Sequence, residues 1–326
     1  MGTEFITERE VWDPFVQQSP YGTFFHRWDF LKAVERHSGA RLLPLAIRKG
    51  EALVWAVPLF LSRKFGVRVL TAMPPNSAIP YLGPVPGAGF DGLGQYRKES
   101  HLSLLSEGIR ELVLEHRPHF TLLSTSPGFT DIRPFLWEGY GAGVNFTYVL
   151  DLTRSLDEIW RALTSRKRVG IARAQKMGYS VQVSTDTLPI YTMGRQRYAE
   201  QGRALPLLSA RYLADLQRTF PEDLTVHHLL RDGAVEGGMV SLRDRRVRAW
   251  LGTTRTADHG NELLYWSVIA SAKAAGALSF ELVGANTPNI NRFKSGFDPR
   301  LETYFSLTRR NMVGRVAEGL YRLVRS

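Results

Sequence analysis

The residues with the clearest potential for chemistry lie near the end of the chain, in the stretch ANTPNINRFKSGFDP. Its lysine, Lys294, stands between an aromatic residue and a Ser-Gly turn. The stretch predicts a short helix that starts at Pro288, with Thr287 or Asn286 as its cap. Gly296 can end that helix in the left-handed conformation, which places Lys294 in the last turn.

A predicted strand, LSFELVG at residues 278–284, precedes this helix. Residues carried on loops at strand ends often contact ligands, so this arrangement could deliver one lysine to a pocket. A purely structural interpretation fits equally well, because a lysine in the last turn of a helix also interacts favourably with the helix dipole.

Other chemistries lack their signatures. The chain has no cysteine, which excludes disulfides and thiolate catalysis and fits a reducing compartment. Neither a serine-hydrolase elbow nor a P-loop pattern occurs. GAGFDG at residues 87–92 matches a dinucleotide-binding pattern, but it follows PYLGPVP and runs into GLGQ. This context predicts a loop and excludes a Rossmann turn.

The histidines do not form a metal site. His116 and His119 straddle Pro118, which breaks the helix needed to place both on one face. His227 and His228 are neighbours in a predicted strand and therefore point to opposite sides. A zinc site needs three or four converging ligands, so we expect no metal.

The charge of the chain points to an anionic partner. Its 326 residues carry a formal net charge of +11, with a pI near 10.0. RNA, a nucleotide, a phospholipid or an acidic wall precursor would suit this charge, and a basic surface kept for solubility is the alternative. No apolar run is long enough to span a bilayer, and the opening residues lack signal-peptide features. We therefore expect the cytoplasm.

The elements that would position Lys294 follow a pattern of secondary structure that occurs twice along the chain. Residues 44–70 and 225–254 each read as three strands separated by turns, and Asp-Gly at 232–233 is a strong hairpin signal. A helix follows each meander, at residues 103–117 and 261–276, and then another strand. This pattern predicts a duplicated α+β fold.

The segment that links the two halves is basic. Ser155 and Glu158 form a capping box, and a helix is predicted over residues 155–178. Such an unbalanced helix is typical of phosphate or nucleic-acid binding, although a solvated face is the ordinary alternative. The basic residues, with no acidic residue among them, are Arg161, Arg166, Lys167, Arg168, Arg173 and Lys176.

Several stretches, taken in order, resemble the FemABX family and its FemAB-like relatives. They are PYGTFFHRWDFLKAV from residue 20, FTYVLDLTRSLDEIWRALTSRKRVGIARAQKMGYSV from residue 146, NELLYWSVIASAKAAGALSFELVGAN from residue 261 and NRFKSGFDPRLETYF from residue 291. The resemblance implies two tandem GNAT-like domains with mostly antiparallel central sheets flanked by helices. We expect them at residues 6–150 and 151–310, with a last helix at 311–326 packing back on the first domain.

The resemblance also implies an activity, the transfer of an amino acid from aminoacyl-tRNA to an amine. The acceptor would be a peptidoglycan-type precursor or a small natural product. An aminoacyl ester is already activated, so orientation, proton transfer and stabilisation of an oxyanion suffice without a cofactor. By its match to the family motif, Lys294 is the candidate catalytic residue, and it would bind substrate phosphate or stabilise developing negative charge.

Other positions match the family less specifically. Arg197 and Tyr198 fall in a region that lines the acceptor cleft in the family, and Phe293 and Tyr304 flank the lysine motif. A buried strand tyrosine is the alternative for Tyr304. The family's long coiled-coil arm has no counterpart here, so the resemblance leaves tRNA contact to the basic helix or another surface.

Two further interpretations stay open. An acyl-CoA-dependent GNAT N-acyltransferase would bind pyrophosphate at a glycine-rich helix start, but RTADHGNELL at 255–264 puts Asp258 there, and KRVGIA at 167–172 lies inside the linker helix. A non-catalytic RNA-binding module would keep the basic helix but would have no use for Lys294.

Overall fold

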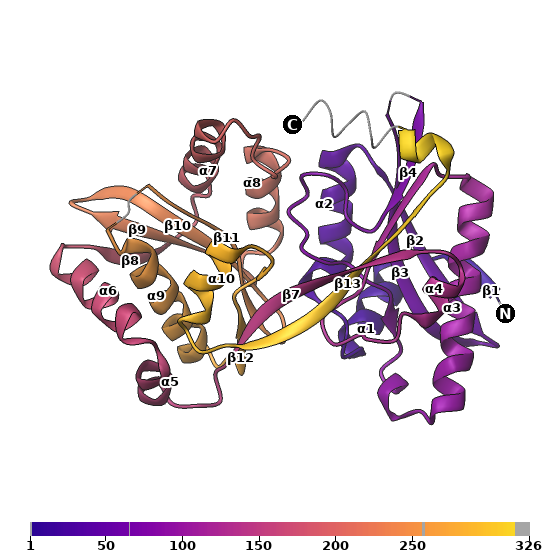
Figure 1. Cartoon of the computed structure of the whole chain (residues 1–326), viewed down its shortest axis with the longest axis horizontal. Helices are drawn as coiled ribbons and strands as arrows, with labels where there is room; N and C mark the ends of the chain where they lie inside the picture. Colours follow the sequence, from indigo (N-terminus) through magenta and orange to yellow (C-terminus); the bar gives the residue numbers. More distant parts are fainter. Residues whose placement is uncertain (1, 65, 256–257, 317–326) are drawn as a thin grey trace. The chain divides into compact units, whose positions relative to one another are not determined.

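The computed structural model describes residues 2–64, 66–255 and 258–316. The chain forms two compact units. The first unit runs to Asn145 and takes up the chain again from Thr303, and the second unit is Phe146–Glu302. Two long strands pass between the units, β7 (Gly141–Asp151) and β13 (Arg300–Arg310). Figure 1 shows the elements in chain order.

The first unit is built on a mostly antiparallel sheet with the strand order β1-β2-β3-β4-β6-β13, in which only β4 and β6 are parallel. Its remaining strand, β5, pairs with β3. The other strands of this unit are β1 (Gly2–Phe5), β2 (Arg41–Lys49), β3 (Ala52–Lys64), β4 (Val67–Thr71), β5 (Val85–Pro86) and β6 (Phe120–Ser124).

Helices cover both faces of this sheet. The residues from Leu42 to Ile47 of β2 are accordingly all buried, whereas a strand with one solvent-exposed face would alternate buried and exposed residues. α3 lies on the face that carries Ile47, where Gly108 approaches the Ile47 side chain so closely that a Cβ would come within 2.8 Å. The helices are α1 (Arg9–Gln18), α2 (Trp28–Ser38), α3 (Gln95–His116) and α4 (Arg133–Trp137), with short 3-10 turns at Phe24–His26 and Phe90–Gly92.

The second unit has the strand order β7-β12-β11-β10-β9-β8, in which only β11 and β12 are parallel. The hairpin predicted at Asp232 and Gly233 is present, and both residues have the positive φ that such a turn needs. The strands are β8 (Ser180–Ser184), β9 (Leu224–Arg231), β10 (Ala234–Arg243), β11 (Val247–Thr254) and β12 (Ser279–Glu281).

Two sets of helices cover opposite faces of this second sheet. Gly238 of β10 faces Ile190 of α7, whereas Gly252 of β11 faces Tyr265 of α9. α5, α6 and α9 share one apolar core with Phe280 of β12. The helices are α5 (Leu156–Ala162), α6 (Ser165–Lys176), α7 (Leu188–Glu200), α8 (Ala210–Thr219), α9 (Gly260–Ala274) and α10 (Pro288–Ser295).

The predicted α+β class with mostly antiparallel sheets is confirmed, but two local predictions are wrong. The single helix over residues 155–178 is two helices, because the Thr164 N–H donates to the Gly296 carbonyl at 3.0 Å instead of continuing the helix. The capping box of Ser155 and Glu158 is present. Gly296 is right-handed, with φ −65°.

Most of the predicted helix at 311–326 lies outside the described residues. Its start is in the first unit, and the Asn311 N–H donates to the His119 carbonyl at 3.2 Å. The segment 87–92 forms a loop with a 3-10 turn, as expected. Within the part of the chain that the structure describes, no helix combines the length and apolar character that crossing a bilayer requires.

Candidate active site

The second unit contains a point where two neighbouring parallel strands part. β11 and β12 pair only at Val247 with Phe280 and at Arg248 with Glu281. Beyond Glu281 the chain follows β7 instead, since the Leu282 N–H donates to the Tyr148 carbonyl at 2.8 Å. β11 stays with β10 up to Thr254.

A β-bulge accompanies this divergence. Val240 of β10 pairs with Leu251, and the next residue, Ser241, pairs with Ala249, so Trp250 is the extra residue of β11. Bulges disrupt the ladder locally and are frequent beside active sites, because they redirect the backbone of one strand.

Lys294 reaches the divergence from α10. Its ammonium donates to the carbonyl oxygens of Val283 and, at 3.1 Å, Gly284. These two residues follow the end of β12 and both have positive φ, 48° and 75°. For a β-branched residue such as Val283 this conformation is strained, and strain of this kind gathers at functional sites.

The environment of Lys294 changes its acid strength. The side chain is 8% exposed. Burial lowers the pKa of Lys294 to about 8, and the negative charge of Glu281 opposes this shift only in part. An ammonium group has three N–H donors, and the two carbonyls accept from two of them. The third can serve a substrate oxygen.

A buried polar network fixes the last paired residues before the strands part. Glu281 is fully buried and accepts from the Thr147 hydroxyl at 2.9 Å. Its other oxygen lies 3.0 Å from Nε of Arg248, whose Nη1 lies 2.6 Å from Asp244. Because each charge is paired, the network holds β7, β12 and β11 together next to Lys294.

Lys167 belongs to this site and not to an exposed basic face. It is 5% exposed, and its Nζ lies 3.4 Å from Oε1 of Glu262 in α9. The same nitrogen lies 3.3 Å from the centre of the Phe293 ring and 4.9 Å from that of Phe297. The tRNA contact predicted for Lys167 therefore has no geometric basis, because the ammonium is enclosed by aromatic rings and a carboxylate.

The remaining basic residues of this segment divide into two kinds. Arg168 is half-buried and donates to the carbonyls of Arg161 and Leu163 at the end of α5. The exposed cations, which could meet a polyanion, are Arg161, Arg166, Arg173 and Lys176.

The other predicted substrate-binding residues are spread over different elements. Arg197 is exposed and Tyr198 half-buried near the end of α7, on the sheet face opposite to Tyr265 and α10. Phe293 packs edge-on against Tyr265 at 5.2 Å between ring centres. Tyr304 is a buried strand residue of the first unit, 5.3 Å from the ring of Tyr81.

Tyr265, Glu281 and Arg248 are site residues that sequence reasoning missed. The Tyr265 hydroxyl would lie 4.0 Å from a Cβ placed on Gly252, just beyond the bulge, and burial raises the pKa of Tyr265 to about 12. Glu281 carried a usable signal, because a carboxylate within the apolar strand LSFELVG requires a buried partner. Tyr265 lies in an ordinary apolar helix, so the sequence gave no signal for it.

The start of α9 is closed. Its cap residue, His259, has φ 63°, and Glu262 in the first turn puts a carboxylate at the helix start. α6 packs directly on this turn, since a Cβ on Gly170 would come within 2.9 Å of His259 Nδ1 and 3.4 Å of Glu262 Cγ. A phosphate could not approach the helix N-terminus on this side without displacing α6.

Comparisons with known proteins agree with this fold. Residues 161–295 match the model of the acetyltransferase (GNAT) domain family. The crystal structure of FemX aligns over 94% of this chain and 97% of its own, with a TM-score of 0.69 and 11% identity. A search of curated proteins gave no match.

Two other solved structures are similar over comparable lengths. L-PGS from Bacillus licheniformis covers 94% of this chain and 93% of its own, with a TM-score of 0.58 and 12% identity. A tandem GNAT protein from the clavulanic acid biosynthesis pathway covers 94% and 98%, with a TM-score of 0.55 and 14% identity. The chain thus has the fold of FemX and of tandem GNAT proteins, and the domain match supports acyl transfer as its class of reaction.

Proposed function

We propose that this protein, folded like FemX and the tandem GNAT proteins, transfers an aminoacyl group from aminoacyl-tRNA to an amine. The product is an amide, and the acceptor is an amine of a peptidoglycan-type precursor or of a small natural product. Aminoacyl-tRNA as donor implies a reaction in the cytoplasm. The ester is already activated, so the reaction needs no cofactor.

The observation that carries this proposal is the closed start of α9. In an acyl-CoA-dependent enzyme the backbone N–H groups of such a helix start would bind the pyrophosphate. Here the close packing of Gly170 in α6 against His259 and Glu262 occupies that place. A donor that carries its phosphates elsewhere, as tRNA does, avoids this obstacle.

Lys294 supports the chemical step. The neutral amine attacks the ester carbonyl carbon, and the new N–C bond forms while the carbonyl oxygen becomes an oxyanion. The third donor of the Lys294 ammonium stabilises this oxyanion. The C–O bond to the ribose then breaks, and the proton lost by the amine ends on the leaving ribose oxygen.

The exposed cations of α5 and α6 would attract the tRNA backbone. Arg161, Arg166, Arg173 and Lys176 are exposed, and no acidic residue interrupts the segment. Replacing Arg166 and Arg173 with glutamate should weaken tRNA binding and flatten its salt dependence. The matched control is Arg211→Glu, an exposed residue of α8, which contacts α7. Equal salt slopes for all variants would contradict this tRNA surface.

An acyl-CoA N-acyltransferase is the second candidate, because the matched domain family is described as an acetyltransferase. The two donors are separated by one experiment. The protein is incubated with an amine panel and either labelled aminoacyl-tRNA or acyl-CoA, with ribonuclease pretreatment as control. We expect a product only with intact aminoacyl-tRNA. A product that survives ribonuclease would contradict the tRNA donor, and a product that requires acyl-CoA would establish the second candidate.

A further inference from the structure

Arginines from neighbouring strands gather at one end of the sheet in the first unit. Arg63 of β3 lies opposite Arg68 of β4, and Arg309 of β13 lies opposite Thr121 of β6. Thr121 is also the partner of Leu70, two residues after Arg68. Cross-strand partners and residues two apart share a face, so all three arginines and Thr121 lie on one face of the sheet.

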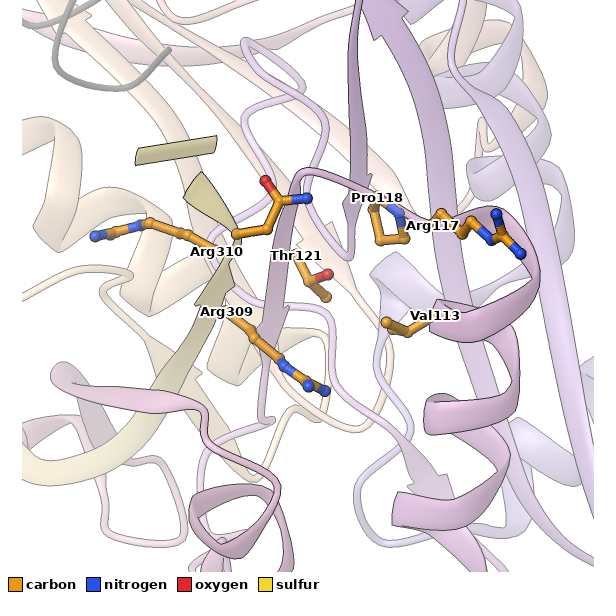
Figure 2. Close-up of a pocket in the computed structure, with 7 residues that line it drawn as sticks. Val113, Arg117, Pro118, Thr121, Arg309 and Arg310 are labelled. Carbon is orange, nitrogen blue, oxygen red and sulfur yellow. The ribbon is translucent and has the colours of Figure 1, made fainter. Parts of the chain in front are cut away.

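A pocket with a volume of about 280 Å³ opens on this face, next to the end of α3. Figure 2 shows Arg309 extending from β13 toward Val113. The side chains of Arg117 and Arg310 extend in opposite directions in this view, away from Thr121. Pro118 and Asn311 complete the lining. Among the described residues, no acidic side chain lines this pocket.

Among the described residues of this unit, the arginines contact aromatic rings and carbonyl groups. The Arg309 guanidinium lies 5.9 Å from the ring centre of Tyr140, and Nε of Arg68 donates to the Arg117 carbonyl at 3.0 Å. Arg310 lies over the Phe120 ring at 5.5 Å and is not part of the group. Contacts with carbonyl groups and aromatic rings do not neutralise the positive charge of these arginines. Like charges directly opposite one another, as at Arg63 and Arg68, destabilise a sheet.

Neutral donors accompany the cations. Oδ1 of Asn311 accepts from the Gly314 N–H at 3.0 Å, which leaves the Asn311 amide nitrogen to donate. Thr121 contributes a hydroxyl from the pocket floor. A guanidinium fork with neighbouring N–H and O–H donors is the arrangement that binds phosphate oxygens best. The volume is slightly below the usual range for small-molecule sites, which suits a phosphate group with few further atoms.

We propose that this pocket binds a phosphate-bearing small molecule, with Arg309, Thr121 and Asn311 as donors and Arg117 at its rim. The ligand is either a free phosphate ester or the headgroup of a phospholipid. This site lies wholly in the first unit and does not rest on the acyl-transfer proposal.

Calorimetric titration of the full protein with inorganic pyrophosphate at low salt tests the free ligand. Sedimentation with vesicles of phosphatidylglycerol, compared with phosphatidylcholine, tests the headgroup. We expect saturable binding in one of the two assays. Arg309→Ala should weaken it about tenfold or more, as the loss of a charge-assisted hydrogen bond would, and Arg117→Ala at the rim should weaken it less. Arg309→Lys keeps the charge without the fork, so its affinity should lie between those of the unaltered protein and Arg309→Ala.

Arg97→Ala is the matched control, because it removes the same charge from the exposed opposite end of α3. Thermal unfolding of each variant shows whether it is folded. Two results would overturn the proposal. They are no saturable binding in either assay and an equal loss of binding in Arg97→Ala.

Discussion

The ammonium nitrogen of Lys167 lies 3.3 Å from the centre of the Phe293 ring and 3.4 Å from a carboxylate oxygen of Glu262. One side chain of α6 thus contacts both α10 and the first turn of α9. Lys294 directly follows Phe293 in α10, so this contact lies one residue from the candidate catalytic lysine.

The first prediction concerns the pair of Lys167 and Glu262. Lys167→Ala leaves the Glu262 carboxylate without its partner and removes the cation from the Phe293 ring. The free energy of unfolding should fall by about 3–5 kcal/mol, as for broken buried pairs. The double variant Lys167→Met with Glu262→Gln should recover most of this loss, because no unpaired charge remains. Urea denaturation measures the free energy of unfolding of both variants, provided that its dependence on urea concentration, the m value, is the same for each. A double variant as unstable as Lys167→Ala would show that the ion pair is not the cause.

The second prediction concerns Gly296, whose right-handed φ would suit any residue. Its Cβ would meet Lys167 Cε at 3.0 Å and the Thr164 hydroxyl at 3.2 Å, so close packing requires the glycine. Gly296→Ala should lower the free energy of unfolding by about 1–3 kcal/mol. The control is Gly92→Ala, since a Cβ there meets nothing within 4 Å. Equal stability of the two variants would refute the packing argument.

The third prediction is a pH dependence of catalysis. The protonated form of Lys294 stabilises the oxyanion, and burial lowers its pKa to about 8. Activity should therefore fall as the pH rises through about 8, and Lys294→Arg should move this fall upward because arginine keeps its charge. Lys294→Ala should lower kcat by about 10²–10³-fold. These effects are read from kcat and kcat/KM between pH 6 and 10. Turnover of Lys294→Ala close to that of the unaltered protein would reject the assignment.

The fourth prediction is a pH dependence of stability that comes from His227. Both ring nitrogens are buried, with no hydrogen-bond partner among the described residues, and burial together with the charge of His228 lowers the pKa of His227 to about 4. In the unfolded chain the pKa of this histidine is near 6.5, so between pH 6.5 and 4 the unfolded chain binds the proton more readily than the folded one. Stability should therefore decrease as the pH falls from about 6.5 through 4, by roughly 3 kcal/mol at most.

His227→Leu should remove this part of the acid sensitivity, because an apolar side chain suits the position beside Met239. His37→Leu in α2, in the other unit, controls for the loss of any histidine. Denaturant midpoints measured at pH 4.5, 5.5 and 7 would show the difference. If the denaturant midpoint of His227→Leu depends on pH as steeply as that of the unaltered protein, the acid sensitivity comes from other groups.

Local signals in the sequence were sufficient for several elements. Asp232 and Gly233 specify their hairpin because both adopt positive φ at little cost. Ser155 and Glu158 satisfy one another's backbone N–H groups within one turn, so the start of α5 could be read directly. Pro288 likewise marked the start of α10.

Contacts between distant residues defeated the other local predictions. The helix break at Thr164 depends on the Gly296 carbonyl, far along the chain. The basic segment gave no sign that Lys167 faces inward while Arg166 faces water. The strand LSFELVG did not reveal that its pairing with β11 stops at Glu281, since only the paths of β7 and β11 decide it.

The sequence by itself determined the alternation of strands and helices and the α+β class, because periodicity and turn residues are local properties, and its resemblance to a known family made Lys294 the candidate. Only the tertiary structure decided that Lys294 sits where β11 and β12 part, that Lys167 is buried against Phe293, and that α6 closes the start of α9. These features depend on which side chains meet across the sheet. Burial and pairing then set the charge that each side chain can carry.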